Sequence, residues 1–399
     1  MRFVAPRSLR ALPLRKNAFL WNNLKIYPMG KMTNQHEKYM KRAIALARRG
    51  IGRTSPNPAV GCVIVKDGTI VGNGWHRKAG GPHAEVHALC QAGETAKNAD
   101  VYVTLEPCAH YGKTPPCADA LIDAGVKRVF TAMVDPNPKV MGRGLAALRV
   151  AGVEVLTGLM GEESRLLNEP FIKHVTTGFP FVILKSAMTL DGKTATANGD
   201  SKWITNELSR RYVHRIRSMV DAVMVGVGTV SADDPLLTSR IAGGKDPIRV
   251  IVDSSLSLPL ESQVLHLKSS SRTVIATLAA DSAKAEKLRE CGVELLHCRE
   301  KDGRIDLHDL FARLGKRGVQ SVLLEGGSTL AGDALRHGLI DKFLLFYAPR
   351  LLGGEGPGLF AGLGAGRIDD APLLRDVKIR RFGGDILLEG YPEGPCLPV

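Results

Sequence analysis

The first half of the chain alternates between the hydrophobic spacing of helices and that of strands. Four apolar residues ahead of Gly50 share one helix face: Met40, Ala43, Ile44 and Ala47. Two apolar runs flank Asp67-Gly68, a pair typical of a β-hairpin turn. The pattern predicts strands over 60–65, 69–71, 101–105, 128–134 and 153–156, and helices from about 84, from 117 and over 144–151. Strands that alternate with helices indicate an α/β domain.

The second half repeats this alternation after an expected linker over 168–180. The pattern predicts strands over 181–187, 222–225, 248–252, 273–276, 322–324 and 343–347, and helices over 207–218, 282–291, 307–316 and 329–336. A terminal hairpin is expected around Gly383-Gly384, with strands over 377–381 and 386–388. With 399 residues, 44% of them hydrophobic and 24% charged, the chain fits two globular α/β domains. No apolar run approaches the roughly 18 residues that span a bilayer.

Basic residues are concentrated at the start of the chain. The net charge is +14, and residues 1–36 contribute seven cations and no acidic residue, which leaves +7 for the remainder. A modest positive balance suits phosphorylated substrates better than nucleic acid, because the sequence has no basic stripe with interleaved aromatic residues. Residues 1–33 are expected to form a disordered basic extension. Two interpretations stay open for the segment before Met32, an organellar transit peptide and a stretch that precedes a true start at Met32.

Seven cysteines are spread along the chain without the spacing of a disulfide framework. This pattern is typical of a reduced, intracellular protein. Cys62 lies in an apolar run and is expected to be a small buried hydrophobe. The sequence therefore predicts a cytoplasmic protein, with an organellar location as the alternative if residues 1–31 are a transit peptide.

One group of residues carries recognisable metal chemistry. His83, Cys108 and Cys117 match the three ligands of a catalytic zinc ion, which leaves the fourth position open for water. Zinc lowers the pKa of that water toward neutrality. Glu85, two residues after the histidine, fits the proton carrier of the nucleobase deaminases, and Pro107 precedes the first cysteine as in their signature. The sequence therefore predicts a zinc-dependent nucleobase deaminase.

The spacing of the two thiols departs from the common pattern. Two residues usually separate the cysteines, but here eight residues, 109–116, lie between Cys108 and Cys117. His83 and Cys117 are both expected at the start of a helix, where the helix dipole favours a thiolate over a thiol. His87 follows His83 by four residues, but a zinc-protease motif needs its glutamate directly after the first histidine. We therefore interpret His87 as a structural residue.

Several segments together resemble one enzyme family. Residues 56–61 (PNPAVG), 83–88 (HAEVHA) and 104–117 (TLEPCAHYGKTPPC) resemble the bifunctional pyrimidine deaminase/reductases of riboflavin biosynthesis. In the second half, residues 185–195, 201–205 and 232–238 resemble the reductase domain of that family. The resemblance implies a cytidine-deaminase-like three-layer domain over 34–179 and a dihydrofolate-reductase-like domain over 180–396. It also implies one zinc ion, NADPH and a dimer or tetramer, with neither nucleic acid nor membrane as a partner.

The insert between the cysteines is expected to hold the phosphoribosyl group of the substrate. Lys113 offers a cation, Thr114 a hydroxyl group and Gly112 a close approach to the backbone, although an ordinary loop with a solvated Lys113 is the alternative. The resemblance places five further residues at the pyrimidine or in the wall of its pocket: Asn57, His76, His110, Asp135 and Asn137. For the last two, a plain turn is an equally good interpretation.

The second site rests on a glycine-rich turn and on the resemblance. Residues 325–330 follow a strand and open a helix whose N–H groups suit a pyrophosphate, with a plain turn as the alternative. Residues 226–231 lack the third glycine of a dinucleotide fingerprint. The resemblance places these residues along NADPH: Ala187, Trp203, Thr229, Asp233, Ser254, Gly327, Ser328, Thr329, Leu330, Ala331, Gly332 and Asp333. It places these along the substrate: Ser201, Arg217, Leu237, Arg240 and Glu325.

Two arginines and two aspartates have specific expected roles in that site. Arg217 and Arg240 are expected to clamp the substrate phosphate, because guanidinium suits two-point phosphate contacts. A solvated helix face is the alternative for Arg217. The proton that accompanies hydride transfer is expected from Asp191, Asp233 or bulk water.

The implied chemistry is two consecutive steps on a phosphorylated pyrimidine. Hydrolytic deamination converts 2,5-diamino-6-(5-phosphoribosylamino)pyrimidin-4(3H)-one to 5-amino-6-(5-phosphoribosylamino)uracil, and NADPH then reduces the ribosyl group to ribityl. A tRNA adenosine deaminase with an unrelated second domain is a rival, opposed by the cysteine spacing. A zinc-stabilised binding protein is a second rival, opposed by the intact Glu85. A chain with one live activity is a third, opposed by the completeness of both sets of motifs.

Overall fold

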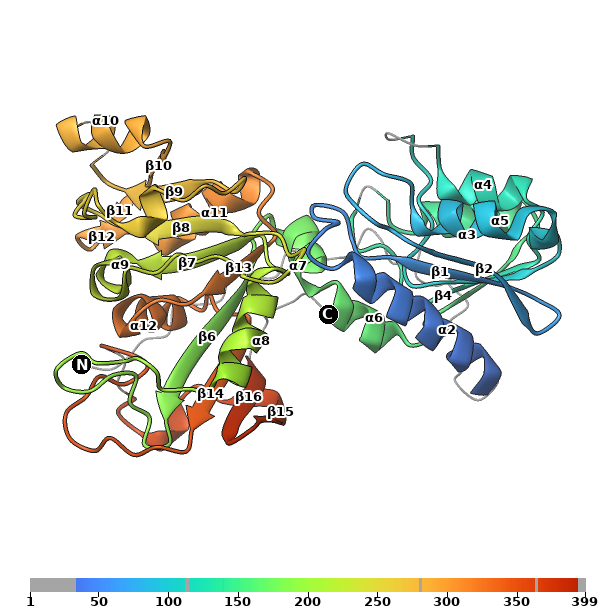
Figure 1. Cartoon of the computed structure of the whole chain (residues 1–399). Coiled ribbons are helices and arrows are strands. Elements are labelled where there is room, and N and C mark those ends of the chain that lie inside the picture. The colour runs from blue at the N-terminus through green and yellow to red at the C-terminus, as the bar shows by residue number, and fades with distance from the viewer. Residues whose placement is uncertain (1–33, 112–114, 139, 280–281, 363–364, 394–399) are drawn as a thin grey trace. The chain divides into compact units, whose positions relative to one another are not determined.

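A computed structural model describes residues 34–111, 115–138, 140–279, 282–362 and 365–393. The expected basic extension over 1–33 lies outside the described residues. The described chain forms two compact units, one of residues 34–50 and 59–167, the other of residues 51–58 and 168–393. Strands alternate with helices in both units, as predicted (Figure 1). No helix of the described chain has the length and apolarity to cross a membrane.

Helices cover both faces of the five-stranded sheet in the first unit (Figure 1). In sheet order its strands are β2 (Thr69–Trp75), β1 (Gly61–Lys66), β3 (Asp100–Val103), β4 (Arg128–Thr131) and β5 (Glu154–Thr157). One face carries α3 (Ala84–Ala92), α4 (Cys117–Asp123) and α5 (Arg143–Val150), and the other carries α2 (Asn34–Ala47) and α6 (Gly161–Leu167). The short helices η2 (Arg48–Gly50) and η3 (Gly93–Ala96) follow α2 and α3.

Side chains along the strands point alternately to the two faces of the sheet, and each face has its own hydrophobic core. Cys62 and Ile64 of β1 pack toward α3, α4 and α5, whereas Val63 and Val65 pack toward α2. The antiparallel β1–β2 hairpin turns at Asp67-Gly68, where both residues have the left-handed backbone that the sequence predicted. Strand β1 also pairs with β3 in antiparallel orientation, whereas the pairs β3–β4 and β4–β5 are parallel. The unit is thus the expected three-layer α/β/α domain, with Cys62 fully buried.

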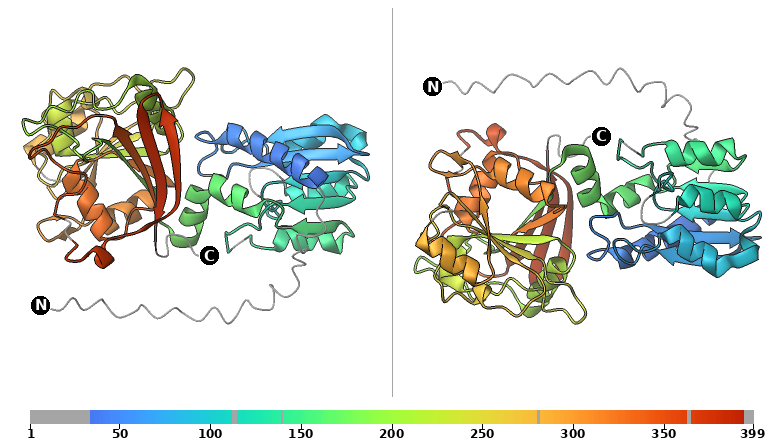
Figure 2. Two further views of the ribbon diagram at one scale, coloured as in Figure 1. Left: turned by 90° about the horizontal axis from the view of Figure 1, so that it is seen from below. Right: turned by 90° about the horizontal axis from the view of Figure 1, so that it is seen from above.

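The second unit is built on a nine-stranded sheet. In sheet order its strands are β10 (Glu294–His297), β9 (Thr273–Thr277), β8 (Ile248–Val252), β7 (Ala222–Gly226), β13 (Ser321–Leu324), β6 (Phe181–Thr189), β14 (Lys342–Ala348), β16 (Asp385–Pro392) and β15 (Leu374–Phe382). All neighbours pair in parallel up to β14, and β16 and β15 add antiparallel strands. Figure 2 shows β15 and β16, in red, at one edge of this sheet. Strands β11 (Glu300–Lys301) and β12 (Arg304–Ile305) form a small separate hairpin.

Helices cover both faces of this sheet, which explains why its parallel strands are continuously apolar. Residues of α11 (Leu307–Lys316) and α12 (Ser328–Arg336) belong to one core, and residues of α8 (Glu207–Arg217), α9 (Val227–Asp233) and α10 (Ala283–Glu290) to the other. The remaining helices are α7 (Glu169–Thr177), η4 (Gln263–Leu265) and η5 (Ile368–Asp370).

The expected linker over 168–180 is largely helical. Helix α7 occupies most of it and buries Phe171 and Ile172. Lys173 of α7 forms an ion pair with Asp341, which also accepts a hydrogen bond of 2.7 Å from the backbone N–H of Val182. These contacts explain why the second compact unit starts at residue 168, ahead of the expected boundary at 180. The helix α9 and strands β10, β11 and β12 were not predicted either, because these segments are short.

Candidate active sites

Three expected metal ligands meet in the first unit. His83 directly precedes α3, Cys117 is the first residue of α4, and Cys108 lies in the loop after β3. Their ligand atoms all lie within 4.8 Å of one another, with His83 Nδ1 3.2 Å from Cys117 Sγ and 3.5 Å from Cys108 Sγ. Across the described ranges, no other cluster of three such side chains could hold a metal ion. The structure therefore brings the predicted ligand set together.

The donor set fits a zinc ion. One imidazole nitrogen and two sulfurs are preferred zinc ligands. The backbone N–H of Cys117 donates to Cys108 Sγ at 3.3 Å. The Cys117 thiol and the His83 ring lower the pKa of Cys108, whereas Cys108 raises the pKa of Cys117. Two thiolates so close repel each other, and a bound divalent cation is what allows both to be ionised.

Glu85 lies in the first turn of α3, beside these ligands. Its side chain is buried, and its Oε2 atom has no hydrogen-bond partner among the described residues. A buried oxygen without a partner is rare in proteins and indicates an interaction with a group that is absent here. Burial raises the pKa of Glu85 to about 7. A carboxyl group with such a pKa can both accept and release a proton at neutral pH.

Glu106 braces the loop that carries Cys108, a role that the sequence analysis did not assign. Its buried carboxylate accepts hydrogen bonds of 2.9 to 3.4 Å from four backbone N–H groups, those of Asp135, Gly142, Gly144 and Leu145. At Gly144, a Cβ atom would lie 1.8 Å from the carbonyl oxygen of Pro107, so the start of α5 packs directly against the Pro107-Cys108 segment. The sequence signal for this role was a glutamate inside an apolar segment, which indicates a buried and hydrogen-bonded carboxylate.

The other predicted deaminase residues differ in their burial and in their distance from the metal ligands. His76 is buried with its ring centroid 5.3 Å from that of His83, whereas the His110 side chain is exposed. Asp135 Oδ1 accepts a hydrogen bond of 2.8 Å from the backbone N–H of Asn137, which is the turn kept as the alternative. The segment 51–58, which contains Asn57, groups with the second compact unit. Lys113 and Thr114 lie outside the described residues.

A large pocket of about 1260 Å³ opens in the second unit at the carboxyl ends of β6, β7, β8 and β13. This edge of a parallel sheet is where nucleotides bind in α/β proteins. The pocket is lined by most of the predicted reductase residues, namely Ala187, Ser201, Trp203, Arg217, Thr229, Asp233, Leu237, Arg240, Ser254, Glu325, Gly327, Ser328, Thr329, Leu330 and Asp333. Ala331 and Gly332 do not line it. Both are buried in α12, and a Cβ atom on Gly332 would lie 2.3 Å from the carbonyl oxygen of Ala361.

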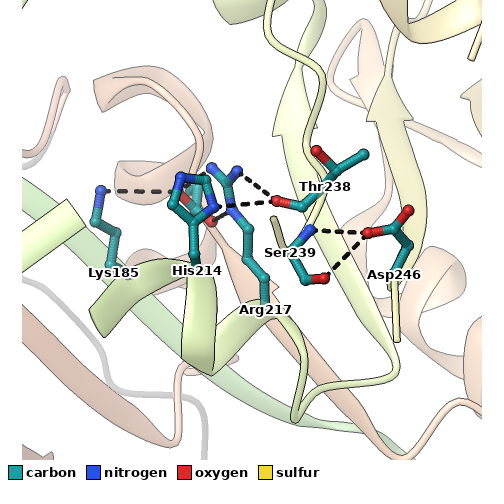
Figure 3. Close-up of polar contacts among 7 residues, drawn as sticks. Lys185, His214, Arg217, Thr238, Ser239 and Asp246 are labelled. Carbon is teal, nitrogen blue, oxygen red and sulfur yellow. Dashed lines mark hydrogen bonds and ion pairs between the residues drawn. The ribbon is translucent and has the colours of Figure 1, made fainter. Parts of the chain in front are cut away.

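A buried cluster of charges lies in this pocket (Figure 3). Arg217 donates to both carboxylate oxygens of Glu325, at 2.7 and 3.0 Å, and to the carbonyl oxygen of Thr238 at 3.2 Å. Lys185 Nζ lies 3.6 Å from Glu325 Oε2. Burial works to raise the pKa of Glu325, but Arg217 and Lys185 outweigh it and hold the pKa at about 2. Arg217 therefore does not lie on a solvated helix face. Three of its five N–H groups are engaged within the protein, and its contact with the substrate phosphate stays a prediction.

Comparisons with known proteins match both halves of the chain. Residues 33–133 match the model of the cytidine and deoxycytidylate deaminase zinc-binding region, and residues 180–388 match that of the RibD C-terminal domain. The riboflavin biosynthesis protein RibD of Actinobacillus pleuropneumoniae is 48% identical over 352 residues, which cover 88% of this chain and 94% of that protein. RibD of Escherichia coli is 45% identical over 367 residues, which cover 89% and 98%. The chain belongs to the RibD family.

Solved RibD structures share the fold of this chain. That of Acinetobacter baumannii RibD, form 1, has a TM-score of 0.83 at 41% identity and covers 90% of this chain and 99% of its own. A diaminohydroxyphosphoribosylaminopyrimidine deaminase/5-amino-6-(5-phosphoribosylamino)uracil reductase from Thermotoga maritima has a TM-score of 0.81 at 40% identity and covers the same shares. The predicted family, fold, zinc and NADPH cofactors and paired deaminase and reductase activities in riboflavin biosynthesis are confirmed.

Only one of the two aspartates expected as proton donors lines the reductase pocket. Asp233 lines the pocket, and its Oδ1 atom lies 3.6 Å from Lys202 Nζ and 3.4 Å from Ser201 Oγ. Asp191 does not line the pocket, and its carboxylate accepts hydrogen bonds from Thr189 Oγ1 at 2.6 Å and from the backbone N–H of Gly353 at 2.7 Å. Asp191 therefore stabilises a turn.

The sequence analysis assigned no role to Lys185. A lysine inside the apolar strand β6 was nevertheless a signal of a buried charge that needs a partner.

Proposed function

We propose that this RibD chain catalyses two consecutive steps on one substrate. The first is hydrolytic deamination of 2,5-diamino-6-(5-phosphoribosylamino)pyrimidin-4(3H)-one to 5-amino-6-(5-phosphoribosylamino)uracil. The second is NADPH-dependent reduction of the ribosyl group to ribityl. The observation that carries the proposal is the convergence of His83, Cys108 and Cys117 beside the buried Glu85, whose Oε2 atom lacks a partner in the described structure.

In the deaminase site, the protein holds the metal and moves protons. Zinc, when bound, supplies a hydroxide nucleophile at neutral pH. Glu85 takes the proton from the attacking water and delivers protons to the ring nitrogen and to the departing ammonia. Burial suits this role, because it raises the pKa of Glu85 above the ordinary value of a carboxyl group. The substrate contacts are assigned to Asn57, His76, His110, Lys113 and Thr114.

In the reductase site, the protein orients two ligands. NADPH, when bound, supplies the hydride for C1′ of the ring-opened ribosyl group. The NADPH contacts are assigned to Ala187, Trp203, Thr229, Asp233, Ser254 and the turn and helix over 327–333, and the substrate contacts to Ser201, Arg217, Leu237, Arg240 and Glu325. Arg240, whose side chain is exposed, is assigned to bind the substrate phosphate. Glu325 forms ion pairs with Arg217 and Lys185 and so holds both cations in place at the pocket. The proton comes from Asp233 or from water.

The organisation of the protein follows from the same proposal. The deaminase domain is assigned to 34–179 and the reductase domain to 180–396, with helix α7 of the boundary segment grouping with the second compact unit, and residues 1–33 precede both. We assign the enzyme to the cytoplasm, with an organelle as the alternative, and to a dimer or tetramer. Exposed apolar residues on the edge strand β15 support self-association, since Val377 is 46% and Ile379 66% exposed.

The decisive experiment follows ammonia release and NADPH oxidation separately in purified, zinc-loaded protein. The diaminopyrimidine phosphoribosylamine is supplied first, and NADPH is added after ammonia has appeared. Ammonia followed by NADPH oxidation supports both steps in this order. Ammonia without NADPH oxidation overturns the assignment of the second site, and absence of ammonia overturns the substrate assignment.

A further inference from the structure

Most cationic side chains in the reductase pocket are already paired within the protein. Lys185 and Arg217 contact Glu325, Lys202 contacts Asp233, Arg210 donates to the carbonyl oxygen of Thr205 at 2.6 Å, and the ring of His214 contacts the carbonyl oxygen of Thr238. Among the described residues that line the pocket, Arg240 and Arg304 are the two arginines whose guanidinium groups make no hydrogen bond or ion pair. Both are exposed, so each can bind an anion that enters the pocket.

The strand order places Arg304 apart from the buried charge cluster. Lys185 and Glu325 come from β6 and β13, which are neighbours on one side of β7. Strand β8 lies on the other side of β7, and Ser254 lines the pocket just beyond its end. Arg304 belongs to this side, because its hairpin directly follows β10, which pairs with β9 next to β8. Just before the hairpin, the backbone N–H of Cys298 donates to the carbonyl oxygen of Thr277 at the end of β9, at 2.9 Å. Figure 1 shows the β11–β12 hairpin close to β8 and β9.

The hairpin turns Arg304 away from the core and beside another cation. Ile305 is buried, and neighbouring residues of a strand point to opposite faces, so Arg304 points outward. Arg304 pairs directly with Lys301 across the hairpin, and directly paired residues share a face. Like charges in this arrangement destabilise a hairpin. Lys301 Nζ lies 3.1 Å from Nε2 of His337, and an imidazole ring brings no negative charge that would offset the two cations. The face therefore favours an anionic ligand.

We propose that Arg304, together with the hydroxyl group of Ser254, binds the 2′-phosphate of NADPH and so selects NADPH over NADH. This inference rests on the proposed use of NADPH by the second site. The 2′-phosphate on the adenosine is the group that distinguishes the two nucleotides. A nucleotide whose nicotinamide lies near Lys185 and Glu325 crosses β7 and brings its adenosine to the β8 side, where Arg304 lies. Guanidinium is suited to such phosphates, and an arginine near a strand end accommodates the 2′-phosphate in other dinucleotide-binding folds.

The test compares binding of NADPH and NADH to the full-length, zinc-loaded enzyme. Equilibrium binding is followed by energy transfer from protein tryptophan to the nicotinamide at fixed ionic strength, for wild type, Arg304→Gln, Arg304→Lys and Arg381→Gln. Arg381 is a matched control, because it is an exposed arginine of β15 outside the pocket. We expect Arg304→Gln to weaken NADPH binding about ten- to a hundredfold, as for a lost charged hydrogen-bonded contact, and to leave NADH binding within about twofold. Arg304→Lys is expected to be intermediate and Arg381→Gln to match wild type.

The outcomes separate this inference from the proposed function. Equal loss of NADPH and NADH binding, or no loss of either, shows that Arg304 does not contact the 2′-phosphate. A wild type that binds NADH as tightly as NADPH also overturns the selectivity, although both enzymatic steps stand. A wild type that binds neither nucleotide, and oxidises neither with the deaminated intermediate, removes the proposed reductase and this inference together.

Discussion

Arg217 of α8 and Glu325, directly after β13, meet in a two-point ion pair although 108 residues separate them. Arg217 Nε lies 2.7 Å from Oε1 of Glu325, and Nη2 lies 3.0 Å from Oε2. Lys185 of β6 adds a second cation at 3.6 Å. Three elements are thus tied together at the pocket by one buried carboxylate. The shape of the reductase site and the stability of its domain are therefore coupled.

Glu325→Gln is expected to abolish reduction and to destabilise the reductase domain. The amide keeps the shape of the side chain but leaves two buried cations uncompensated, which costs about 3–5 kcal/mol for a broken buried pair. Denaturant unfolding of wild type, Glu325→Gln and the control Glu355→Gln measures this cost. Glu355 is exposed and lies outside the pocket, so its variant is expected to match wild type. Full reductase activity in Glu325→Gln would contradict the role of the cluster.

The same carboxylate makes the stability of the reductase domain depend on pH. Its folded pKa of about 2 lies below the ordinary value of 4.5, although burial acts in the opposite direction. A lowered pKa means that the stabilisation is fully present above pH 4.5 and is lost as the pH falls toward 2. The gap in melting temperature between wild type and Glu325→Gln is therefore expected to shrink between these limits. A gap that stays constant on acidification would show that Glu325 does not titrate in this range.

Asp385→Ala is expected to displace the start of α8. The buried Asp385, the first residue of β16, accepts hydrogen bonds from the backbone N–H of Asn206 at 2.8 Å and from Ser209 Oγ at 2.6 Å. Losing two such bonds is expected to cost about 3 kcal/mol of stability. Because α8 carries Arg217, the KM for the deaminated intermediate is expected to rise more than kcat falls, while deamination stays unchanged. The exposed Asp376→Ala is the control, and an unchanged KM in Asp385→Ala would argue against a positioning role.

Glu106→Gln is expected to loosen the zinc site without touching a ligand. An amide offers one oxygen where the carboxylate offers two, so some of the four backbone N–H groups lose their acceptor. The loop that carries Cys108 is then less firmly held, and residues that orient metal ligands typically contribute about ten- to a hundredfold in affinity. Competition with a zinc chelator measures this effect, with Glu94→Gln as an exposed control. Retention of wild-type zinc affinity would limit Glu106 to a packing role.

Glu85→Gln is expected to retain zinc and to lose deamination. The carboxyl group is not a ligand, so metal content by atomic emission stays at the wild-type level. The proton transfers lose their carrier, and deamination is expected to fall by at least about a hundredfold. Reduction of supplied 5-amino-6-(5-phosphoribosylamino)uracil is expected to continue, because Glu85 and the reductase pocket belong to different compact units. Loss of both activities together would contradict the two-site interpretation.

Local signals predicted much of the fold. The helix over 307–316 and the strand over 248–252 were found at their predicted bounds, because each combines a clear hydrophobic spacing with distinct ends. Helix α7 was interpreted as a linker, since Gly178 and Pro180 dominate the pattern and the burial of Phe171 arises only from packing. Strand β10 is too short for its spacing to be distinguished from a loop.

The sequence by itself determined the chemistry of the first site. His83, Glu85, Cys108 and Cys117 have side chains that few other reactions require in that order, and two of the three zinc ligands lie at helix starts that local pattern predicts. The tertiary structure alone decided which charges are used and which are neutralised. Whether Arg217 faces solvent, phosphate or Glu325 depends on strands that pair across more than a hundred residues, and no local pattern encodes that distance. Arg304 is the converse case, an ordinary arginine in sequence that the packing of the β11–β12 hairpin brings to the reductase pocket.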